Sequence, residues 1–152
     1  DIHLAIGKSS TDRQFKKRTN EIKKIYSGID EKEDKHLTGH SLGSSIALHA
    51  MAKSKSVRDN TKSAVLFNTG ITPAFNKELQ KDLKKEDKKE LKQKVVQHHV
   101  KGDPISAALT IGTQIGKVKT TKQTAASSHS LDNNHADKTL KDKDEPEPEP
   151  EE

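Results

Sequence analysis

Short apolar runs separated by long polar stretches dominate the pattern of this sequence. The runs cover residues 2–6, 64–67, 95–100 and 105–111. Runs of this length are typical of buried strands, whereas the segments between the first two runs have the period of helices. The alternation predicts a β-α-β-α-β order, and therefore an α/β fold with a mostly parallel sheet and flanking helices.

The clearest helical period lies at residues 12–27. Its apolar positions recur at offsets of 7, 10, 11 and 14 from the first, which places them on one face: Phe15, Ile22, Ile25, Tyr26 and Ile29. Thr11 and Gln14 match a T-x-x-Q capping box, in which each side chain binds a backbone N–H that the helix start leaves unpaired. Gly28 is expected to end this helix.

Two further helices are predicted. One begins after Gly43 and runs to about Lys53, with a stripe of small and apolar residues that suits close packing on a sheet: Ile46, Ala47, Ala50 and Met51. The other spans about residues 76–94 and contains eight lysines and five acidic residues. Its apolar edge consists of Leu79, Leu83 and Leu91. We expect an edge this narrow to cover a surface but not to build a core.

Composition narrows the possible classes of protein. Leu, Ile, Val and Phe make up 30 of 152 residues, which is at the border where chains stop burying enough apolar surface to fold. The absence of cysteine excludes a disulfide scaffold, a cysteine zinc site and a catalytic thiol, and no apolar stretch is long enough to span a membrane. The length fits one domain, which we place at residues 1–135, followed by a disordered acidic Glu/Pro tail at 136–152.

The charge is distributed unevenly. Residues 145–152 contain five glutamates and no basic residue, so the rest of the chain, with 28 basic and 18 acidic residues, carries +10. A segment with this positive charge could bind nucleic acid, although the near absence of aromatic side chains for base stacking argues against this partner. The lysine-rich segment at 76–94 could instead meet anionic membrane headgroups, or be a plain solvated helix.

Gly39-x-Ser41-x-Gly43 matches the nucleophile elbow G-x-S-x-G. In such an elbow the serine lies in a strained strand-to-helix turn that exposes its Oγ, and the glycines let neighbouring backbone pass without a Cβ clash. The N–H of the next residue, Leu42, then points at the oxyanion of a tetrahedral intermediate. Residues 36–38 can end a short strand, which supplies the required setting. The alternative is a serine at a helix N-cap without reactivity.

A serine nucleophile also needs a base and a residue that orients the base, and in elbow hydrolases the chain order is Ser, Asp or Glu, then His. Asp103 is the best acid, because it follows the apolar run 95–100 at the point where a strand would end. A plain turn aspartate is the alternative. Downstream, only His129 and His135 are available. We prefer His129, because Leu131 can anchor its loop, and keep His135 as the alternative base.

The remaining histidines are expected to be structural. His98 and His99 are adjacent in an apolar run, so their rings point to opposite faces of a strand and cannot bind one ion together. His36 and His40 are four residues apart but not on a helix, and no third ligand is near in sequence. We therefore expect neither a metal ion nor a cofactor.

Four segments of the chain resemble the class 3 lipases, α/β-hydrolases related to fungal triacylglycerol lipases and plant phospholipases A1. Residues 37–43 (L-T-G-H-S-L-G), which include His40, are similar to the elbow of that family. Residues 64–70 resemble the strand and loop that follow it. Residues 102–105 (G-D-P-I) resemble its acid turn, and residues 128–131 (S-H-S-L) resemble its histidine segment.

The resemblance implies an α/β-hydrolase fold with a triad of Ser41, His129 and Asp103. It further implies hydrolysis of carboxylic esters, with acyl esters of lipids such as triacylglycerols or phospholipids as the preferred class, and a lysine-rich insertion at 76–94 in the position of a lid. Leu42 would provide one oxyanion donor. No cofactor is implied.

Two departures from the family pattern change this expectation. Position 44 is Ser where the family usually has Gly, and no R-G-T-type loop, which supplies the family's second oxyanion donor, precedes the first helix. Residues 1–4 resemble the segment that follows that loop. We therefore expect the chain to be a processed product or fragment without the opening strands, and to be weakly active, because one lost donor costs ~10²–10³ in rate.

A structural function is the main alternative. The H-S-L ending also resembles predicted products of large DNA viruses, so the chain could be an interaction or capsid-associated protein that retains a lipase-like fold with little activity. A basic module for nucleic acid or anionic surfaces is the second alternative. For localisation, the cytosol and the virion are the two working expectations, and the absence of cysteine is compatible with a reducing compartment.

Overall fold

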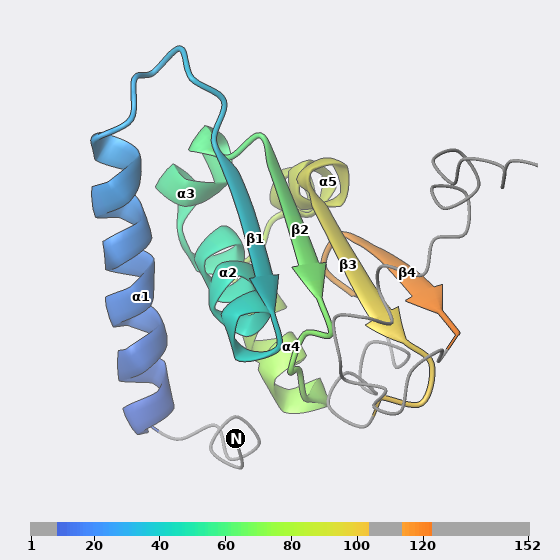
Figure 1. Cartoon of the computed structure of the whole chain (residues 1–152). Helices are drawn as coiled ribbons and strands as arrows, with labels where there is room; N and C mark the ends of the chain where they lie inside the picture. Colours follow the sequence, from blue (N-terminus) through green and yellow to red (C-terminus); the bar gives the residue numbers. More distant parts are fainter. Residues whose placement is uncertain (1–8, 104–113, 123–152) are drawn as a thin grey trace, which may run out of the picture.

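A computed structural model describes residues 9–103 and 114–122 of the chain (Figure 1). Four parallel strands form one sheet in the order β1-β2-β3-β4. The strands are β1 (His36–His40), β2 (Ser63–Phe67), β3 (Val95–Val100) and β4 (Lys117–Thr121). The helices are α1 (Ser9–Ser27), α2 (Leu42–Lys53), α3 (Lys55–Asn60), α4 (Pro73–Gln80) and α5 (Lys85–Lys94). This architecture confirms the predicted α/β class and parallel sheet.

The helices of the crossovers lie on one face of the sheet. α2 and α3 connect β1 to β2, and α4 and α5 connect β2 to β3 (Figure 1). α1 packs against α2 and α3 rather than on the strands. Because all four strands run in the same direction, the segments that follow β1, β2 and β3 emerge at the same edge of the sheet.

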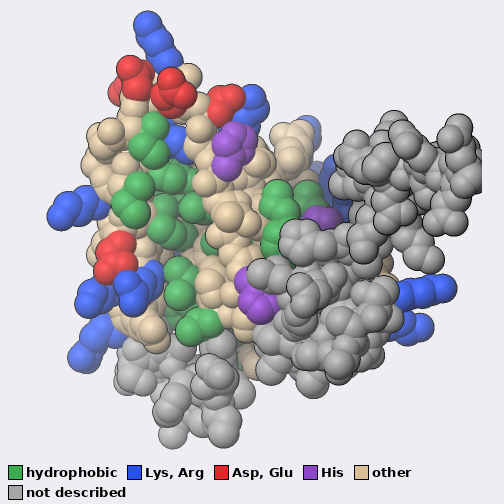
Figure 2. Space-filling model, viewed as in Figure 1, with side chains coloured by type: hydrophobic (Ala, Val, Ile, Leu, Met, Phe, Trp, Pro, Cys, Tyr) green, Lys and Arg blue, Asp and Glu red, His purple; other side chains and the backbone are tan. Residues whose placement is uncertain are grey.

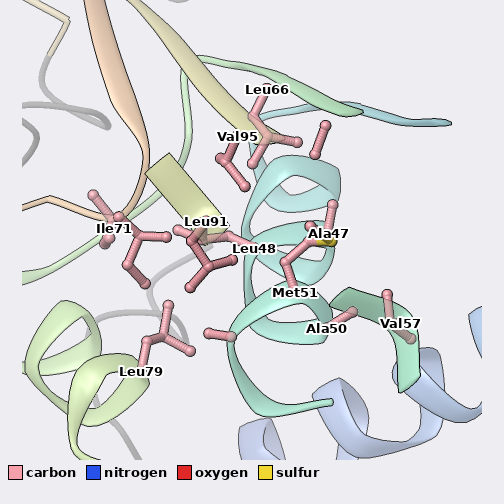
Figure 3. Packing of buried hydrophobic residues seen from close by; sticks show 13 residues of the cluster. Ala47, Leu48, Ala50, Met51, Val57, Leu66, Ile71, Leu79, Leu91 and Val95 are labelled. Atoms are coloured by element: carbon pink, nitrogen blue, oxygen red, sulfur yellow. The ribbon is translucent and has the colours of Figure 1, made fainter. Parts of the chain in front are cut away.

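The core lies between the sheet and the crossover helices (Figure 3). Leu48 and Met51 of α2 are fully buried against Leu66 of β2 and its neighbours. Small residues on α2 allow this close approach. Ala47 and Ala50 of the predicted stripe are buried, as is Ala52, whereas Ile46 is only partly buried and lies outside the core cluster. The other buried members of the cluster are Val57, Ala64, Ile71, Leu79, Leu91, Val95 and Ile115.

The lysine-rich segment is two helices rather than the single helix predicted at 76–94. Thr72 caps α4, because its hydroxyl accepts the N–H of Phe75. A separate helix, α5, begins after Lys84, whose N–H donates to the carboxylate of Asp87. The expectation that this segment builds no core is wrong, because Leu79 and Leu91 are each only 1% exposed and belong to the core cluster.

α1 confirms the helix predicted at 12–27 and ends before Gly28, as expected. Its start differs from the prediction. The helix begins at Ser9, so Thr11 lies inside the first turn and the capping box proposed for Thr11 and Gln14 is wrong. A capping motif identifies a helix start only if the chain does not continue the helical turn upstream of it.

The buried face of α1 is narrower than the apolar period suggested. Ile25 is 63% exposed, and Ile29 lies beyond the helix end and is 37% exposed. An offset of 10 residues rotates a position about 80° away from the starting face, so Ile25 falls on the flank. Thr19 is buried in the stripe instead. The side chains that face the protein are Phe15, Thr19, Ile22 and Tyr26.

β4 is a strand that the sequence pattern did not predict, because residues 117 onward show no apolar period. It pairs in parallel with β3 along its whole length. The predicted runs at 2–6 and 105–111 and the domain boundary at 135 lie outside the described residues. Among the described residues, no helix combines the length and the apolar character needed to cross a membrane.

Candidate active site

Ser41 occupies a strained turn between β1 and α2. Its φ is 54° and its ψ is −118°, a combination that residues with a side chain rarely adopt. Its N–H donates to the carbonyl oxygen of Phe67 at the end of β2, at 2.9 Å. Leu42 is the first residue of α2, so its N–H belongs to the first turn, where backbone donors lack a partner within the helix. The strand–turn–helix setting predicted for the elbow is therefore present.

The two glycines of the elbow have different surroundings. A Cβ added to Gly39 would lie 2.7 Å from the carbonyl carbon of Gly43 and from the N of Ser44, which is closer than real Cβ contacts. A Cβ added to Gly43 would meet nothing within 4 Å. The prediction that a Cβ would clash with neighbouring backbone is thus confirmed for Gly39 and wrong for Gly43.

Asp103 follows β3 at the same edge of the sheet. Its N–H donates to the carbonyl oxygen of Val100 at 3.0 Å, which forms a turn directly after the strand, and the residue is only 1% exposed. Asn68 is the first residue after β2, with a φ of 48° and no exposed surface. Its N–H donates to the carbonyl oxygen of His98 at 2.7 Å, which ties the exits of β2 and β3 together.

The strand order sets the separation between the candidate nucleophile and the candidate acid. β1 and β3 lie on either side of β2, and two strand spacings amount to about 10 Å. A histidine that makes one hydrogen bond from each ring nitrogen joins groups about 8 Å apart. The exits that carry Ser41 and Asp103 are therefore suitably spaced for an imidazole between them. His129 and His135, the two predicted bases, lie outside the described residues.

The charge of Asp103 influences the pKa of His99, but His99 is not suited to be the base. Burial lowers the pKa of His99, an effect that a backbone hydrogen bond at Val100 and the charge of Asp103 oppose. The residue is only 2% exposed, and its Nε2 is 2.8 Å from Thr120 Oγ1. A ring enclosed in this way cannot exchange a proton with a nucleophile that faces substrate.

His98 points to the opposite face of β3, as predicted. Its ring stacks on Phe67 with a centroid distance of 5.2 Å, and burial, with a smaller contribution from Lys119, lowers its pKa. His36 is at the start of β1, with its Nδ1 2.6 Å from Ser63 Oγ. Figure 2 shows histidine side chains on the sheet face that the crossover helices leave open.

Sequence reasoning missed the polar residues that hold the elbow in place. Ser44 and Ser45, in the first turn of α2, have no exposed surface. Ser44 binds the backbone of Phe67 at the end of β2, and Ser45 binds that of Gly70 in the loop that follows. The only signal was that position 44 departs from the glycine of the class 3 lipase pattern. No local pattern indicates that these hydroxyls reach residues more than 20 positions away.

No group of three or more His, Cys, Asp or Glu side chains suited to a metal ion occurs in residues 9–103 and 114–122. Comparison of the chain with protein-family models, with curated proteins and with solved structures finds no match. The interpretation of the site therefore depends on its own geometry and on the resemblance carried by its motifs.

Proposed function

We propose that this chain is a serine hydrolase that cleaves carboxylic esters, with Ser41 as the nucleophile. One observation carries the proposal: Ser41 adopts a strained backbone conformation between a parallel strand and the helix that follows it. Strain of this kind costs about 1–3 kcal/mol and is concentrated at functional sites. An ordinary N-cap serine adopts relaxed extended angles and binds the helix N–H groups, whereas Ser41 makes no such side-chain cap.

The proposed mechanism assigns one role to each residue. Ser41 Oγ attacks the acyl carbonyl, and the base, His129, takes its proton and later delivers it to the leaving alcohol. Asp103 holds the imidazole in the required tautomer and stabilises its positive charge. The N–H of Leu42 donates to the oxyanion. Water then hydrolyses the acyl-enzyme through the same base.

Two further observations support an α/β-hydrolase of the class 3 lipase type. The nucleophile and the acid follow β1 and β3 of a parallel sheet in the required chain order, with one strand between them. The elbow, the following strand and the first two residues of the acid turn, Gly102 and Asp103, lie in the part of the chain that the structure describes and resemble the family. We therefore propose acyl esters of lipids as the preferred substrate class.

A second candidate function, binding to an anionic surface, is favoured by α1. The outer side of this helix carries several basic side chains around a shallow depression: Arg13, Lys16, Lys17 and Lys24, with Asn20 and Glu21. Figure 2 shows basic side chains projecting along this side of the molecule. For this function α1 is better placed than the segment at 76–94, whose leucines are in the core. Steeply salt-dependent binding to anionic vesicles without ester hydrolysis would favour this candidate.

Ester hydrolysis tests the main proposal. We expect the chain to hydrolyse a short-chain p-nitrophenyl ester and Ser41→Ala to lose that activity while its circular dichroism is unchanged. His129→Ala should abolish turnover and His135→Ala should retain it. The reverse pattern would transfer the base to His135, and equal turnover by the wild type and Ser41→Ala would reject the nucleophile.

A further inference from the structure

The first turn of α2 is bound to the end of β2 through a buried serine hydroxyl. Ser44 Oγ donates to the carbonyl oxygen of Phe67 at 3.0 Å and accepts the N–H of the same residue at 3.1 Å. The same carbonyl oxygen also accepts the N–H of Ser41. We call the two hydrogen bonds of Ser44 the Ser44 clamp. The elbow therefore binds both the N–H and the carbonyl oxygen of Phe67.

A second hydroxyl fixes the other end of the loop that follows β2. Ser45 Oγ donates to the carbonyl oxygen of Gly70 at 2.6 Å, and Ser45 has no exposed surface. Between these two attachments, the N–H of Asn68 binds the carbonyl oxygen of His98 in β3. The loop at residues 67–70 is therefore held by α2 on one side and by β3, the strand that leads to Asp103, on the other.

This arrangement bears directly on Ser41. A residue with a φ of 54° relaxes toward ordinary backbone angles unless several contacts with the surrounding structure hold it in place. One constraint is the contact between Gly39 and the backbone at Gly43, which leaves no room for a Cβ. A second constraint is the hydrogen bond from Ser41 to Phe67, whose acceptor is positioned by Ser44. The carbonyl oxygen of Ser41 also accepts the N–H and the hydroxyl of Ser45, at 3.1 and 3.3 Å.

We propose that Ser44 is a positioning residue: through the peptide groups of Phe67, the Ser44 clamp holds Ser41 in its reactive conformation and at a fixed separation from the strand that carries Asp103. This inference rests on the proposed hydrolase function. The glycine that the class 3 lipase pattern usually has at this position carries no hydroxyl and could not form this clamp. Ser44 acts through Phe67 and touches no substrate.

Ser44→Ala removes both hydrogen bonds and keeps the Cβ, and Val57→Ala is the matched control. Val57 is fully buried in α3, so its truncation destabilises the fold without altering the elbow. We expect Ser44→Ala to lower kcat for a p-nitrophenyl ester at least tenfold with KM unchanged, and Val57→Ala to stay within twofold of the wild type for both constants. A Ser44→Ala variant within twofold of wild-type kcat would overturn the proposal.

Amide hydrogen exchange separates this inference from the proposed function. Because the clamp restrains the N–H groups of Ser41 and Phe67, we expect Ser44→Ala to speed exchange at both amides at least tenfold relative to Val57→Ala. Unchanged exchange would overturn the clamp whether or not the chain is an enzyme. Faster exchange in a chain whose wild type hydrolyses no ester would reject the proposed function, and with it the positioning role.

Discussion

Gly39 and Gly43 flank Ser41 symmetrically in the sequence, but they contribute differently to the elbow. Gly39 lies where the end of β1 passes the start of α2, and there is no space for a methyl group between the two backbones. Gly43 is in the first turn of α2 and faces open space. The spacing in the G-x-S-x-G pattern therefore reflects one close contact rather than two.

This difference predicts opposite effects on stability. Gly39→Ala should lower the free energy of unfolding by about 2–3 kcal/mol, because a Cβ there requires the backbone to shift. Gly43→Ala should be neutral or stabilising by up to about 1 kcal/mol, since alanine favours helix over glycine. Urea denaturation of both variants measures the two values. Similar losses in both would contradict the assignment of the close contact to Gly39.

At the residue scale, the sequence was informative where chemistry coincides with a local motif. The elbow pattern predicted the strand-to-helix turn at Ser41, and the end of an apolar run predicted the turn at Asp103. Both turns lie at one edge because parallel strands present their ends together. Ser44 and Asn68 could not be found in this way. Their hydrogen bonds depend on the register between neighbouring strands, and no short-range pattern encodes that register.

Arg58 joins three helices from a nearly buried position. Its Nη1 donates to the carbonyl oxygens of Met51 and Ala52 at the end of α2, at 3.0 and 3.1 Å. Its other guanidinium nitrogens lie 3.4 Å from a carboxylate oxygen of Asp87 and 3.8 Å from one of Glu90, both in α5. The side chain is 6% exposed, so these contacts are only partly screened by water.

We expect Arg58→Met, which keeps most of the apolar stem, to lower the free energy of unfolding by about 2 kcal/mol, because buried carbonyl oxygens and two carboxylates lose a charged donor. Lys55→Met is the control, since the ion pair of Lys55 with Asp59 is exposed and such pairs contribute less than about 1 kcal/mol. Thermal or urea unfolding provides both numbers. Equal effects would show that Arg58 is no more important than a surface ion pair.

His49 of α2 packs its side chain against α1. Its Nδ1 is 3.1 Å from Thr19 Oγ1, and its ring stacks on Phe15 at a centroid distance of 5.1 Å. Burial lowers the pKa of His49; Asp12 opposes this effect, and Lys53 and Lys16 add to it. The folded chain therefore resists protonation at this ring more than the unfolded chain does.

The sign of the pH dependence follows from this shift. The unfolded state takes up a proton below about pH 6.5, whereas folded His49 takes it up only at a lower pH, so stability should fall as the pH drops from 7 toward 5. His49→Gln, which keeps a polar group near Thr19, should show a shallower fall. The free energy of unfolding measured across this range tests the assignment. An unchanged slope would exclude His49 as a contributor. Among the described histidines, His98 and His99 would then be the next to test, because burial also lowers their pKa values.

Elements with a strong apolar period were predictable, and elements fixed by their neighbours were not. α2 matched its predicted range because its small buried stripe suits a sheet. β4 was missed because it pairs with β3 while carrying lysines, a composition typical of strands with little covering. The break between α4 and α5 was missed because it depends on the cap of Asp87 on Lys84 rather than on a glycine or proline.

At the scale of the whole molecule, the low apolar content is offset by polar side chains with internal partners. Thr61, Asn68 and Gln97 are among the fully buried residues. Gln97 Nε2 donates to the carbonyl oxygen of Ile115 at 2.8 Å, and Thr61 Oγ1 donates to that of Val57 at 2.6 Å. Donors satisfied in this way cost little, although Gln97 Oε1 is buried without a hydrogen-bond partner among the described residues. Composition therefore placed the chain at the border of folding without showing how its sheet is held together.

The central claim is that Ser41 is an activated nucleophile, and a fluorophosphonate probe tests it most directly. This probe forms a stable adduct with activated serines, and peptide mass mapping identifies the residue modified. We predict one adduct per chain, located on Ser41 and absent from Ser41→Ala and from chain unfolded in urea. A folded chain that remains unlabelled, or an adduct on another of its serines, would contradict the account.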